Sequence, residues 1–496
     1  MSAAPREFAR EMGRANPGRY RPTHRRTTRS PTRNHAVVIG ASMAGLLAAR
    51  VLSETYDRVT VLDRDTWADR PEPRGGVPHG RHAHGLLARG REVLDKLFPG
   101  LTDHLVRDGA VVGDLQGQVR WYFASGSLAP SVSGLRGLAV SRPALEHEVR
   151  RRVGALRGVT IESGWVVRDL LADPTRGRIA GVKVAAVGSD GPPRRLAADL
   201  VVDASGRNSH SPDWLRTLGY PAPKEEKIRV DVSYATRHFR WEPGSAGDAL
   251  AVIVAASADS AQGGAMIRQE GDRWILTLGG YHGERAPLEL AGFRTWAARQ
   301  APEFGAVASR AEPLDEGHYF RFPASTRLRY ERLRRFPEAF VVMGDAVCSF
   351  NPVYGQGMTV AAAEALALRS CLANGVERLG PRFFAAIRPI VDVPWQIAAG
   401  ADLALPGTPG RPPLRLRLIN RYVERLQRAA RDDTELAEAF LRVANLKAAP
   451  PSLMRPGRML RVLRKGSGRR PAPSRATRPA GRRTPIPAVD TEASGR

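Results

Sequence analysis

A short glycine pattern followed by an acid is the first feature of the chain that could bind a ligand. The segment VVIGASMAGLLAARVLSETYDRVTVLD has Gly40 and Gly45 at the first and third positions of a G-x-G-x-x-G fingerprint, and Ser42 at the second. Such glycines form a tight turn, let a pyrophosphate approach the backbone and allow close helix packing. The Ser42 hydroxyl can donate to a phosphate oxygen. Asp63 follows Gly40 by 23 residues, suits an adenosine ribose hydroxyl and would repel a 2′-phosphate. The segment predicts a dinucleotide site, either FAD or NAD, and disfavours NADP.

Two further segments follow short apolar runs and carry polar groups that could reach the same ligand. DASGR spans residues 203–207, and GDAVCSFNPVYGQGM spans residues 344–358. The Asp345 carboxylate would suit the ribityl chain of a flavin. Free backbone N–H groups at the start of the next helix can face the flavin pyrimidine edge, where negative charge develops on reduction. These N–H groups belong to Gly355, Gln356, Gly357 and Met358.

Each of these two segments alone has a simpler explanation, because an Asp after a strand often caps the helix of an ordinary turn. Three segments at the ends of apolar strands fit one shared ligand better than three unrelated turns. The carboxyl ends of parallel strands meet at one edge of a sheet. The three segments together predict FAD.

The hydrophobic pattern supplies the sheet that these segments need. Apolar strands at residues 35–39 and 59–62 flank a helix at 46–53, which makes one βαβ unit. From about residue 225 to 325 the pattern changes to longer strand-like runs with one helix, at 293–299. The predicted fold class is α/β: a Rossmann-like FAD-binding domain with an inserted antiparallel-sheet substrate domain and C-terminal helices.

The expected units follow from these patterns. They are a disordered basic tail (1–34), a discontinuous FAD-binding domain (35–224 and 325–380), a substrate-binding β-sheet domain (225–324), a helical region (381–453) and a second disordered basic tail (454–496). The formal net charge is +26, and residues 1–34 and 455–496 contribute +7 and +10 of it. These ends lack aromatic residues interleaved on a basic face, so a nucleic-acid partner is not favoured.

Cysteine content and hydropathy restrict the compartment. Cys348 and Cys371 are the only cysteines, which excludes a disulfide framework and a cysteine-based zinc site. The longest apolar stretch, residues 249–256, is far short of the ~20 residues of a membrane-spanning helix. We expect a cytoplasmic protein without a transmembrane segment.

The order of these motifs resembles the flavoprotein monooxygenases of the para-hydroxybenzoate hydroxylase type. RGGVPHGRHAHGLL, DLVVDASGR, YATRHFR and GDAVCSFNPVYGQGM are most similar to the squalene-epoxidase-like branch, which includes bacterial polyether epoxidases. The resemblance covers about residues 35–400. The residues it assigns to FAD binding are Gly40, Ser42, Ala44, Gly45, Asp63, Arg64, Arg142, Asp203, Arg207, Gly344, Asp345, Pro352, Gly355, Gln356, Gly357 and Met358.

Some of these assignments are more specific. Arg142 matches an arginine that the family uses near the FAD ribityl chain and phosphates. Asp203 and Arg207 lie in the segment that touches both flavin and pyridine nucleotide. Ser205 and the extra residue in DASG depart from the usual Asp-Gly pair, and this departure argues against direct binding of NAD(P)H by the chain.

The resemblance implies a reaction in which a flavin C4a-hydroperoxide, formed from reduced FAD and O2, epoxidises or hydroxylates a hydrophobic organic substrate in secondary metabolism. The electron donor is NAD(P)H or a separate flavin reductase, since no second dinucleotide fingerprint is present. Such chemistry needs no protein nucleophile. The alternatives are an FAD-dependent reductase or desaturase of the prenyl-reductase type, a halogenase, and a non-enzymatic flavin- or nucleic-acid-binding protein. The WxWxIP signature and an obvious active-site lysine of a halogenase are missing.

The cluster His79, His82 and His84 has no acidic or cysteine partners close by, so no metal site is predicted. By resemblance, Arg81 and His82 are candidates for the flavin edge, and otherwise they lie in a solvated loop. Cys348 is either a buried structural thiol or a neighbour of the flavin ring. Aromatic residues of the inserted sheet are either pocket wall or core. These aromatic residues are Tyr234, Phe239 and Trp274.

Overall fold

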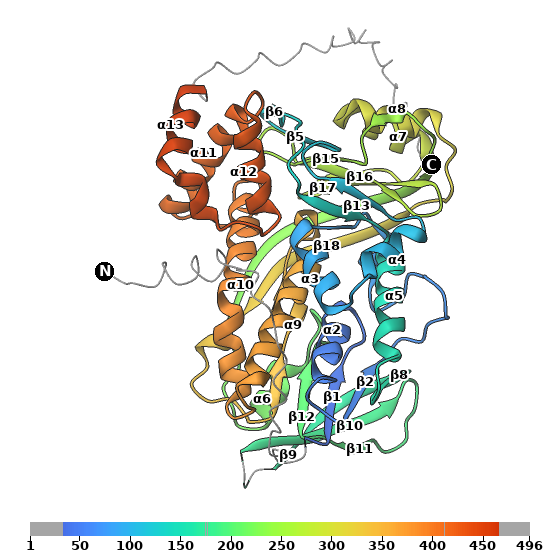
Figure 1. Cartoon of the computed structure of the whole chain (residues 1–496), viewed down its shortest axis with the longest axis vertical. Helices are drawn as coiled ribbons and strands as arrows, with labels where there is room; N and C mark the ends of the chain where they lie inside the picture. Colours follow the sequence, from blue (N-terminus) through green and yellow to red (C-terminus); the bar gives the residue numbers. More distant parts are fainter. Residues whose placement is uncertain (1–32, 174, 176, 411, 466–496) are drawn as a thin grey trace, which may run out of the picture.

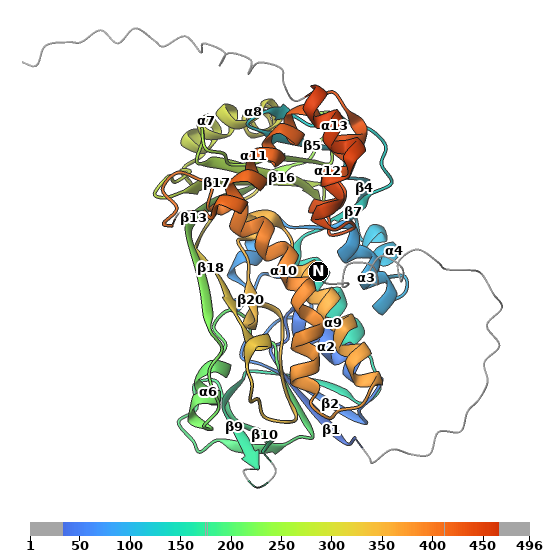
Figure 2. The ribbon, with the colours of Figure 1, turned by 90° about the vertical axis from the view of Figure 1, so that its left-hand side faces the viewer.

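The structure is a computed structural model that describes residues 33–173, 175, 177–410 and 412–465. Two sheets lie at opposite ends of an elongated molecule, the parallel sheet at the lower end and a larger, mostly antiparallel sheet at the upper end, in which only β15 (Ala251–Val254) and β5 (Val119–Phe123) of the described strands pair in parallel (Figure 1). Helix α10 (Leu379–Asp402) runs from the lower end toward a group of helices beside the larger sheet (Figure 2). Among the described residues, no helix is both long and apolar enough to cross a membrane.

The parallel sheet has the strand order β19-β12-β1-β2-β8. Its strands are β1 (His35–Ile39), β2 (Arg58–Asp63), β8 (Val159–Ser163), β12 (Leu200–Asp203) and β19 (Phe340–Val342). Every position of β1 is buried, as expected for a central strand of a covered parallel sheet. The helices that pack with it are α2 (Met43–Leu52), α5 (Arg142–Gly154) and α10, and α9 (Gly357–Ala373) packs on α2 and α10. This arrangement confirms the predicted Rossmann-like domain.

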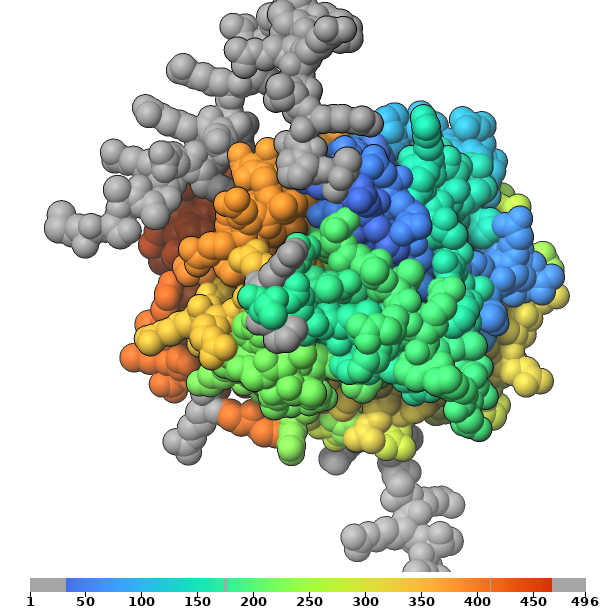
Figure 3. Space-filling view, turned by 90° about the horizontal axis from the view of Figure 1, so that it is seen from below, coloured from blue at the N-terminus to red at the C-terminus, as the bar shows by residue number. Residues whose placement is uncertain are grey.

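A small antiparallel sheet packs against β2 and β12 and covers the lower end of the molecule, where the teal and green residues dominate the centre of Figure 3. Its strands are β9 (Trp165–Asp173), β10 (Arg178–Ala186) and β11 (Arg194–Ala197). Side chains such as Ile179 and Val182 are buried in the main core. The small sheet therefore closes one side of the nucleotide domain.

The larger sheet has the order β20-β18-β13-β17-β16-β15-β5-β6. Its strands are β5 (Val119–Phe123), β6 (Gly126–Ser127), β13 (Glu225–Arg240), β15 (Ala251–Val254), β16 (Gln262–Gln269), β17 (Arg273–Tyr281), β18 (His318–Leu328) and β20 (Cys348–Ser349). Strands β5, β6 and β20 come from the ranges assigned to the FAD-binding domain by sequence. The inserted segment thus shares its sheet with strands from both flanking parts of the chain.

Two helices, not the single one expected at 293–299, cover the core of this sheet. These are α7 (Leu290–Gln300) and α8 (Pro302–Arg310). Ala301 is extended, with φ −150°, so the chain breaks and restarts at Pro302, a favoured first helical residue. Phe239 and Trp274 lie in the buried cluster beneath these helices, so both aromatic residues belong to the core.

The C-terminal region is helical beyond the predicted limit. It contains α11 (Leu414–Ala429), α12 (Thr434–Ala444) and α13 (Pro456–Lys465). The prediction of disorder from residue 454 is wrong for α13, because Val462 is fully buried in the cluster that holds these helices together. The rest of that expected tail, 466–496, and residues 1–32 lie outside the described residues.

The remaining elements connect these layers. They are α3 (Ala88–Leu97), α4 (Leu101–Arg107), α6 (Ser211–Thr217), a sheet of β3 (Gly85–Leu86), β7 (Arg136–Ala139) and β4 (Val111–Asp114), strand β14 (Ser245–Asp248), and the short 3₁₀ turns η1 (Pro78–Arg81), η2 (Tyr330–Arg332), η3 (Gly344–Ala346), η4 (Pro352–Tyr354) and η5 (Pro450–Met454).

Candidate cofactor and substrate site

A cavity of about 540 Å³ lies where the loops after β1, β2, β12 and β19 meet the larger sheet. The three predicted flavin-binding segments therefore converge on one space. The predicted residues that line it are Gly40, Ser42, Ala44, Asp63, Arg64, Arg142, Arg207, Gly344, Asp345, Pro352, Gly355, Gln356, Gly357 and Met358.

Two of the predicted cofactor residues, Gly45 and Asp203, do not line this cavity. At Gly45 an added Cβ would lie 1.8 Å from the Gly40 carbonyl oxygen, so this glycine serves the packing of the turn against α2. The Asp203 carboxylate is fully buried and accepts hydrogen bonds from the Ser205 N–H and the hydroxyls of Ser209 and Ser211. Asp203 therefore fixes the shape of the loop, whose neighbouring residues 204–208 do line the cavity.

The tentative flavin-edge residues Arg81 and His82 also lie off the cavity. The His82 ring is buried against Tyr234 and Phe320, and its Nδ1 is 2.7 Å from the Thr236 hydroxyl. Arg81 is exposed. Sequence reasoning selected the wrong members of this loop because the turn η1 determines which side chains face inward.

His79 and His84 line the cavity instead. Burial lowers the pKa of His79 well below its ordinary value and the pKa of His84 to about 4. Both rings are therefore neutral at neutral pH. The His84 Nδ1 lies 2.9 Å from the His82 carbonyl oxygen, which can only accept, so Nδ1 carries the proton and Nε2 is left as an acceptor.

The first glycine turn has the geometry that the fingerprint predicts. Gly40 has φ +100°, a conformation that side chains strongly disfavour, and its N–H donates to the Leu62 carbonyl at 2.7 Å. An added Cβ there would lie 2.6 Å from the Ala204 carbonyl oxygen. Gly40 thus allows β1, β2 and β12 to end close together around the cavity.

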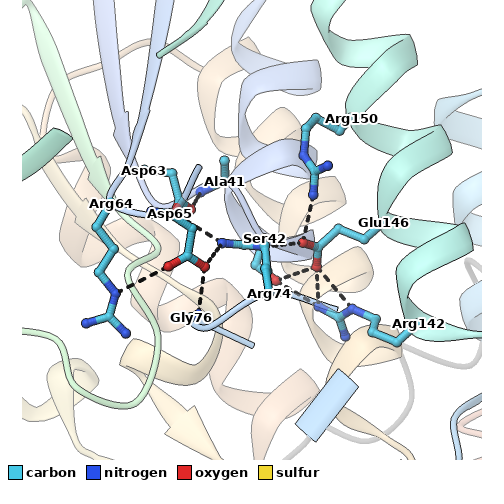
Figure 4. Close-up of polar contacts among 10 residues, drawn as sticks. All are labelled: Ala41, Ser42, Asp63, Arg64, Asp65, Arg74, Gly76, Arg142, Glu146 and Arg150. Atoms are coloured by element: carbon cyan, nitrogen blue, oxygen red, sulfur yellow. Dashed lines mark hydrogen bonds and ion pairs between the residues drawn. The ribbon is translucent and has the colours of Figure 1, made fainter. Parts of the chain in front are cut away.

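A buried network of charged groups surrounds the start of α2 (Figure 4). Glu146, on α5, accepts from Arg74 Nε at 2.8 Å, from Arg142 Nη2 at 3.0 Å and from the Ser42 hydroxyl at 2.8 Å. Arg150 donates to the same carboxylate at 3.1 Å. Burial raises the pKa of Glu146, but Arg142 and Arg74 outweigh it and lower the pKa to about 2. Glu146 is therefore ionised and holds the arginines in place.

Arg74 also connects this network to the acid that ends β2. Its Nη1 donates to Asp65 at 2.8 Å and to Asp63 at 3.1 Å. The other Asp63 oxygen accepts from the Ala41 N–H at 2.6 Å. Sequence reasoning missed Arg74 and Glu146, although the RGG sequence at 74–76, within the loop that follows β2, and the Arg142–Glu146 spacing of four residues on a helix were available signals.

Four features of the cavity fit bound FAD. The N-termini of α2 and α9 both border it and offer free backbone N–H groups to anionic groups. Backbone at Gly355 and Gly357 faces open space, since no heavy atom lies within 4 Å of an added Cβ. Asp345 is exposed toward the cavity, and Arg74 Nη2 is buried without a partner among the described residues. These groups would hold the ribityl chain and the phosphates.

The other end of the cavity is apolar. Its walls come from β4, β5, β7, β15, β16, β18 and the loop before β15. The side chains there are Val111, Leu115, Val119, Trp121, Leu138, Leu250, Ala251, Ile253, Ala265, Ile267, Phe320 and Phe322. Tyr234 packs behind Phe320 and does not line the cavity. The strands contribute no acid or base to this lining, and the guanidinium of Arg207, from the loop after β12, lies 5.2 Å from the centre of the Phe322 ring at its edge. The strand walls therefore suit an uncharged ligand.

The remaining candidates from the sequence are the thiol of Cys348 and a metal site. Cys348 is buried on β20, and burial raises the pKa of its thiol well above the ordinary value. Such a thiol is unreactive, in agreement with a structural role. Within the described part of the chain, no group of three His, Cys, Asp or Glu residues could hold a metal ion.

Comparison with known proteins agrees with this geometry. The family model described as "FAD binding domain" matches residues 33–378. Protein Rv3254 of Mycobacterium tuberculosis is 36% identical over 427 residues, which cover 83% of this chain and 89% of that protein. Kynurenine 3-monooxygenase of Salinispora tropica is 26% identical, with 73% of this chain and 78% of that protein covered.

Solved structures show the same fold. The flavin-dependent brominase Bmp2 superposes with a TM-score of 0.61 at 16% identity, covering 87% of this chain and 98% of that one. PqsL of Pseudomonas aeruginosa, a probable FAD-dependent monooxygenase, gives a TM-score of 0.56 at 18% identity, covering 82% and 100%. At these identities the likeness concerns the fold alone.

Proposed function

Because the chain belongs to the FAD binding domain family, within the para-hydroxybenzoate hydroxylase-like flavin monooxygenase superfamily, we propose that it oxygenates an uncharged, hydrophobic organic molecule. The chain is an FAD-dependent oxidoreductase. The observation that carries the substrate class is the continuity of one cavity from the cofactor residues to walls in which every side chain contributed by the strands is uncharged. We further place it in the squalene-epoxidase-like branch, in cytoplasmic secondary metabolism, with either epoxidation or hydroxylation as the reaction.

The residues that line the cavity have different roles in the proposed reaction. When bound and reduced, FAD supplies the electrons that activate O2 for insertion of one oxygen atom into the substrate. Arg74 and Arg142, held by Glu146, offset phosphate charge at the start of α2. The N–H groups at the start of α9 would hold the flavin where they can stabilise negative charge on its pyrimidine edge. The apolar walls exclude water and orient the substrate, while the His84 Nε2 offers a proton acceptor beside them.

The electron donor is NAD(P)H, used directly or through a separate flavin reductase. The loop after β12, in which Asp203 is used internally, supports the separate reductase. A halogenase is the less favoured alternative, since no lysine stands among the described residues that line the cavity.

The first test is a visible absorption spectrum of the purified chain, repeated during titration with FAD. We expect a flavin spectrum and saturable binding. Protein that stays colourless at saturating FAD would contradict the cofactor assignment.

The second test compares 1-naphthol with 1-naphthoate, two probes of the same shape that differ in charge. Because the strands of the apolar end contribute no counter-ion, we expect the FAD-loaded protein to bind 1-naphthol at least about tenfold more tightly, a difference of about 1.4 kcal/mol. Equal affinity would refute the uncharged substrate class. Turnover under labelled O2, with NADPH and a flavin reductase, should give a labelled product. An unlabelled, reduced product would assign the chain to the prenyl-reductase type.

A further inference from the structure

The C-terminal helices expose more large apolar side chains than any other part of the described chain. Seven of the fourteen exposed large apolar side chains among the described residues fall between positions 414 and 463. They are Leu414, Leu418, Ile419, Met454, Met459, Leu460 and Leu463. Contiguous exposed apolar residues generally indicate an interaction surface.

These exposed side chains do not belong to the buried cluster that holds the C-terminal helices together. Helices α11 and α13 contact each other and lie together at one end of the molecule in both ribbon views (Figures 1 and 2). Leu426 of α11 and Val462 of α13 are fully buried in the cluster between the helices. Leu460 and Leu463 are three positions apart and lie side by side on α13, and Leu460 lies on the side opposite Val462. Leu414, Leu418 and Ile419 occupy the first half of α11, and the buried Leu426 lies on the same stripe nearer its end, so α11 is packed near its end and exposed near its start.

The same two helices are strongly basic. Helix α11 carries five arginines against Glu424, and α13 carries three arginines and Lys465 without an acidic residue. Some of these charges are paired locally: Arg461 contacts Glu435 at 2.5 Å, and Lys465 contacts Asp433 at 3.0 Å. Even so, the surface combines apolar side chains with an excess of positive charge.

From this combination we propose that the exposed faces of α11 and α13, here called the basic apolar face, dock on a membrane that contains anionic lipids. Amphipathic helices of this kind lie in the interface, with leucine and methionine side chains between the headgroups and arginines on lipid phosphates. Charge complementarity selects this partner. A second copy would bring two basic faces together, and a nucleic-acid backbone would leave the leucines in water.

The location gives such docking a consequence for the cavity. Leu115 and Trp121 pack against the buried cluster of the C-terminal helices, and both also line the apolar end of the cavity. Gln356, another lining residue, donates to the Ala444 carbonyl at the end of α12 at 3.2 Å. Docking would therefore bring the apolar end of the cavity close to a lipid phase, the phase in which an apolar compound accumulates.

Vesicle co-sedimentation of the full-length, FAD-loaded chain tests the proposal. The probes are vesicles of phosphatidylcholine alone and of equimolar phosphatidylcholine and phosphatidylglycerol. We expect binding to the mixed vesicles, weakened but not abolished by high salt, because the apolar contribution is not screened. The double variant Leu460→Asp/Leu463→Asp should bind at least about tenfold more weakly, since it replaces two apolar contacts with the bilayer by two charges that anionic lipids repel.

A matched control is Val187→Asp/Val376→Asp, at exposed apolar positions elsewhere in the chain. It should bind the mixed vesicles like the unmodified chain.

Equal binding by Leu460→Asp/Leu463→Asp would overturn the proposal and assign lipid binding to basic residues outside this face. Absence of binding by the unmodified chain would also overturn it. A dimer in sedimentation velocity that the leucine variant loses would assign the face to a second copy. Equal flavin spectra would show that both variants fold.

Discussion

The two ends of the cavity are built in different ways. The cofactor end consists of short loops, each of which follows one strand of the parallel sheet and presents backbone groups and a few charged side chains. The apolar end consists of side chains that come one or two at a time from strands far apart in the chain. Cofactor binding is therefore encoded in local sequence, whereas substrate selection depends on which strands pair.

The largest expected effect lies at the cofactor end. Glu146→Ala removes the carboxylate that Arg74, Arg142 and Arg150 share. Loss of one partner from a buried charge cluster typically costs about 3–5 kcal/mol. We expect a decrease of that size in the free energy of unfolding of FAD-free protein, measured in urea, and partial recovery with FAD. Glu148→Ala is the control, with a loss of about 1 kcal/mol or less because its arginine partners are more exposed.

The pH dependence of the unfolding free energy is a second test of the role of Glu146. The pKa of Glu146 is about 2 in the folded chain, below the ordinary value of 4.5. The ionised carboxylate therefore stabilises the fold fully above pH 4.5, and this contribution is lost as the pH falls toward 2. The unmodified chain should lose more unfolding free energy over this interval than Glu146→Ala. Parallel pH profiles for the two proteins would show that folding does not lower the pKa of Glu146.

Asp345→Ala should weaken FAD binding without loss of stability. A hydrogen bond to a charged group contributes about 1.5–3 kcal/mol, so the dissociation constant of FAD should rise about ten- to a hundredfold. Burial raises the pKa of Asp345, so removal of this carboxyl should leave the unfolding free energy of FAD-free protein unchanged or increase it. Flavin fluorescence titration and urea unfolding measure the two quantities. Unchanged FAD affinity would contradict the assigned role.

Ile253→Arg tests whether the two ends act separately. The side chain lines the apolar end, so a charge there should reduce 1-naphthol binding at least about tenfold and favour 1-naphthoate. FAD affinity should stay within about twofold. Ile253→Met is the neutral control of similar volume. A parallel loss of FAD binding would show that the ends are coupled.

The smallest effect is expected for Ser42→Ala. The Ser42 hydroxyl donates to Glu146 and accepts from Arg142, both at 2.8 Å, so it is already engaged within the protein. FAD affinity should change by no more than about threefold, the low end of a neutral hydrogen bond. A loss of tenfold or more in the fluorescence titration would support the direct phosphate contact predicted from the fingerprint.

Prediction from sequence succeeded where one segment determines its own structure. Strands β1 and β12 were found because buried parallel strands contain unbroken apolar runs, here 36–39 and 200–202, and Gly40 was found because its turn requires a positive φ. Arg74 was missed because its position depends on Glu146, which is 72 residues away in sequence. The assignment of Arg81 and His82 to the cavity required the path of the whole loop. Helix α13 was missed because its arginines masked a single buried valine, Val462.

The pairing of β13 with β18 has a mechanical consequence. These strands pair from Glu225–Leu328 to Thr236–His318, across a bulge between Arg229 and Val232, and so run from the nucleotide domain into the larger sheet. Two hydrogen-bonded strands form a stiff brace, unlike a single flexible linker. The halves of the molecule should therefore melt in one cooperative transition. A protease cut in the surface loop at residues 188–193 should leave the fragments associated, with the flavin still bound.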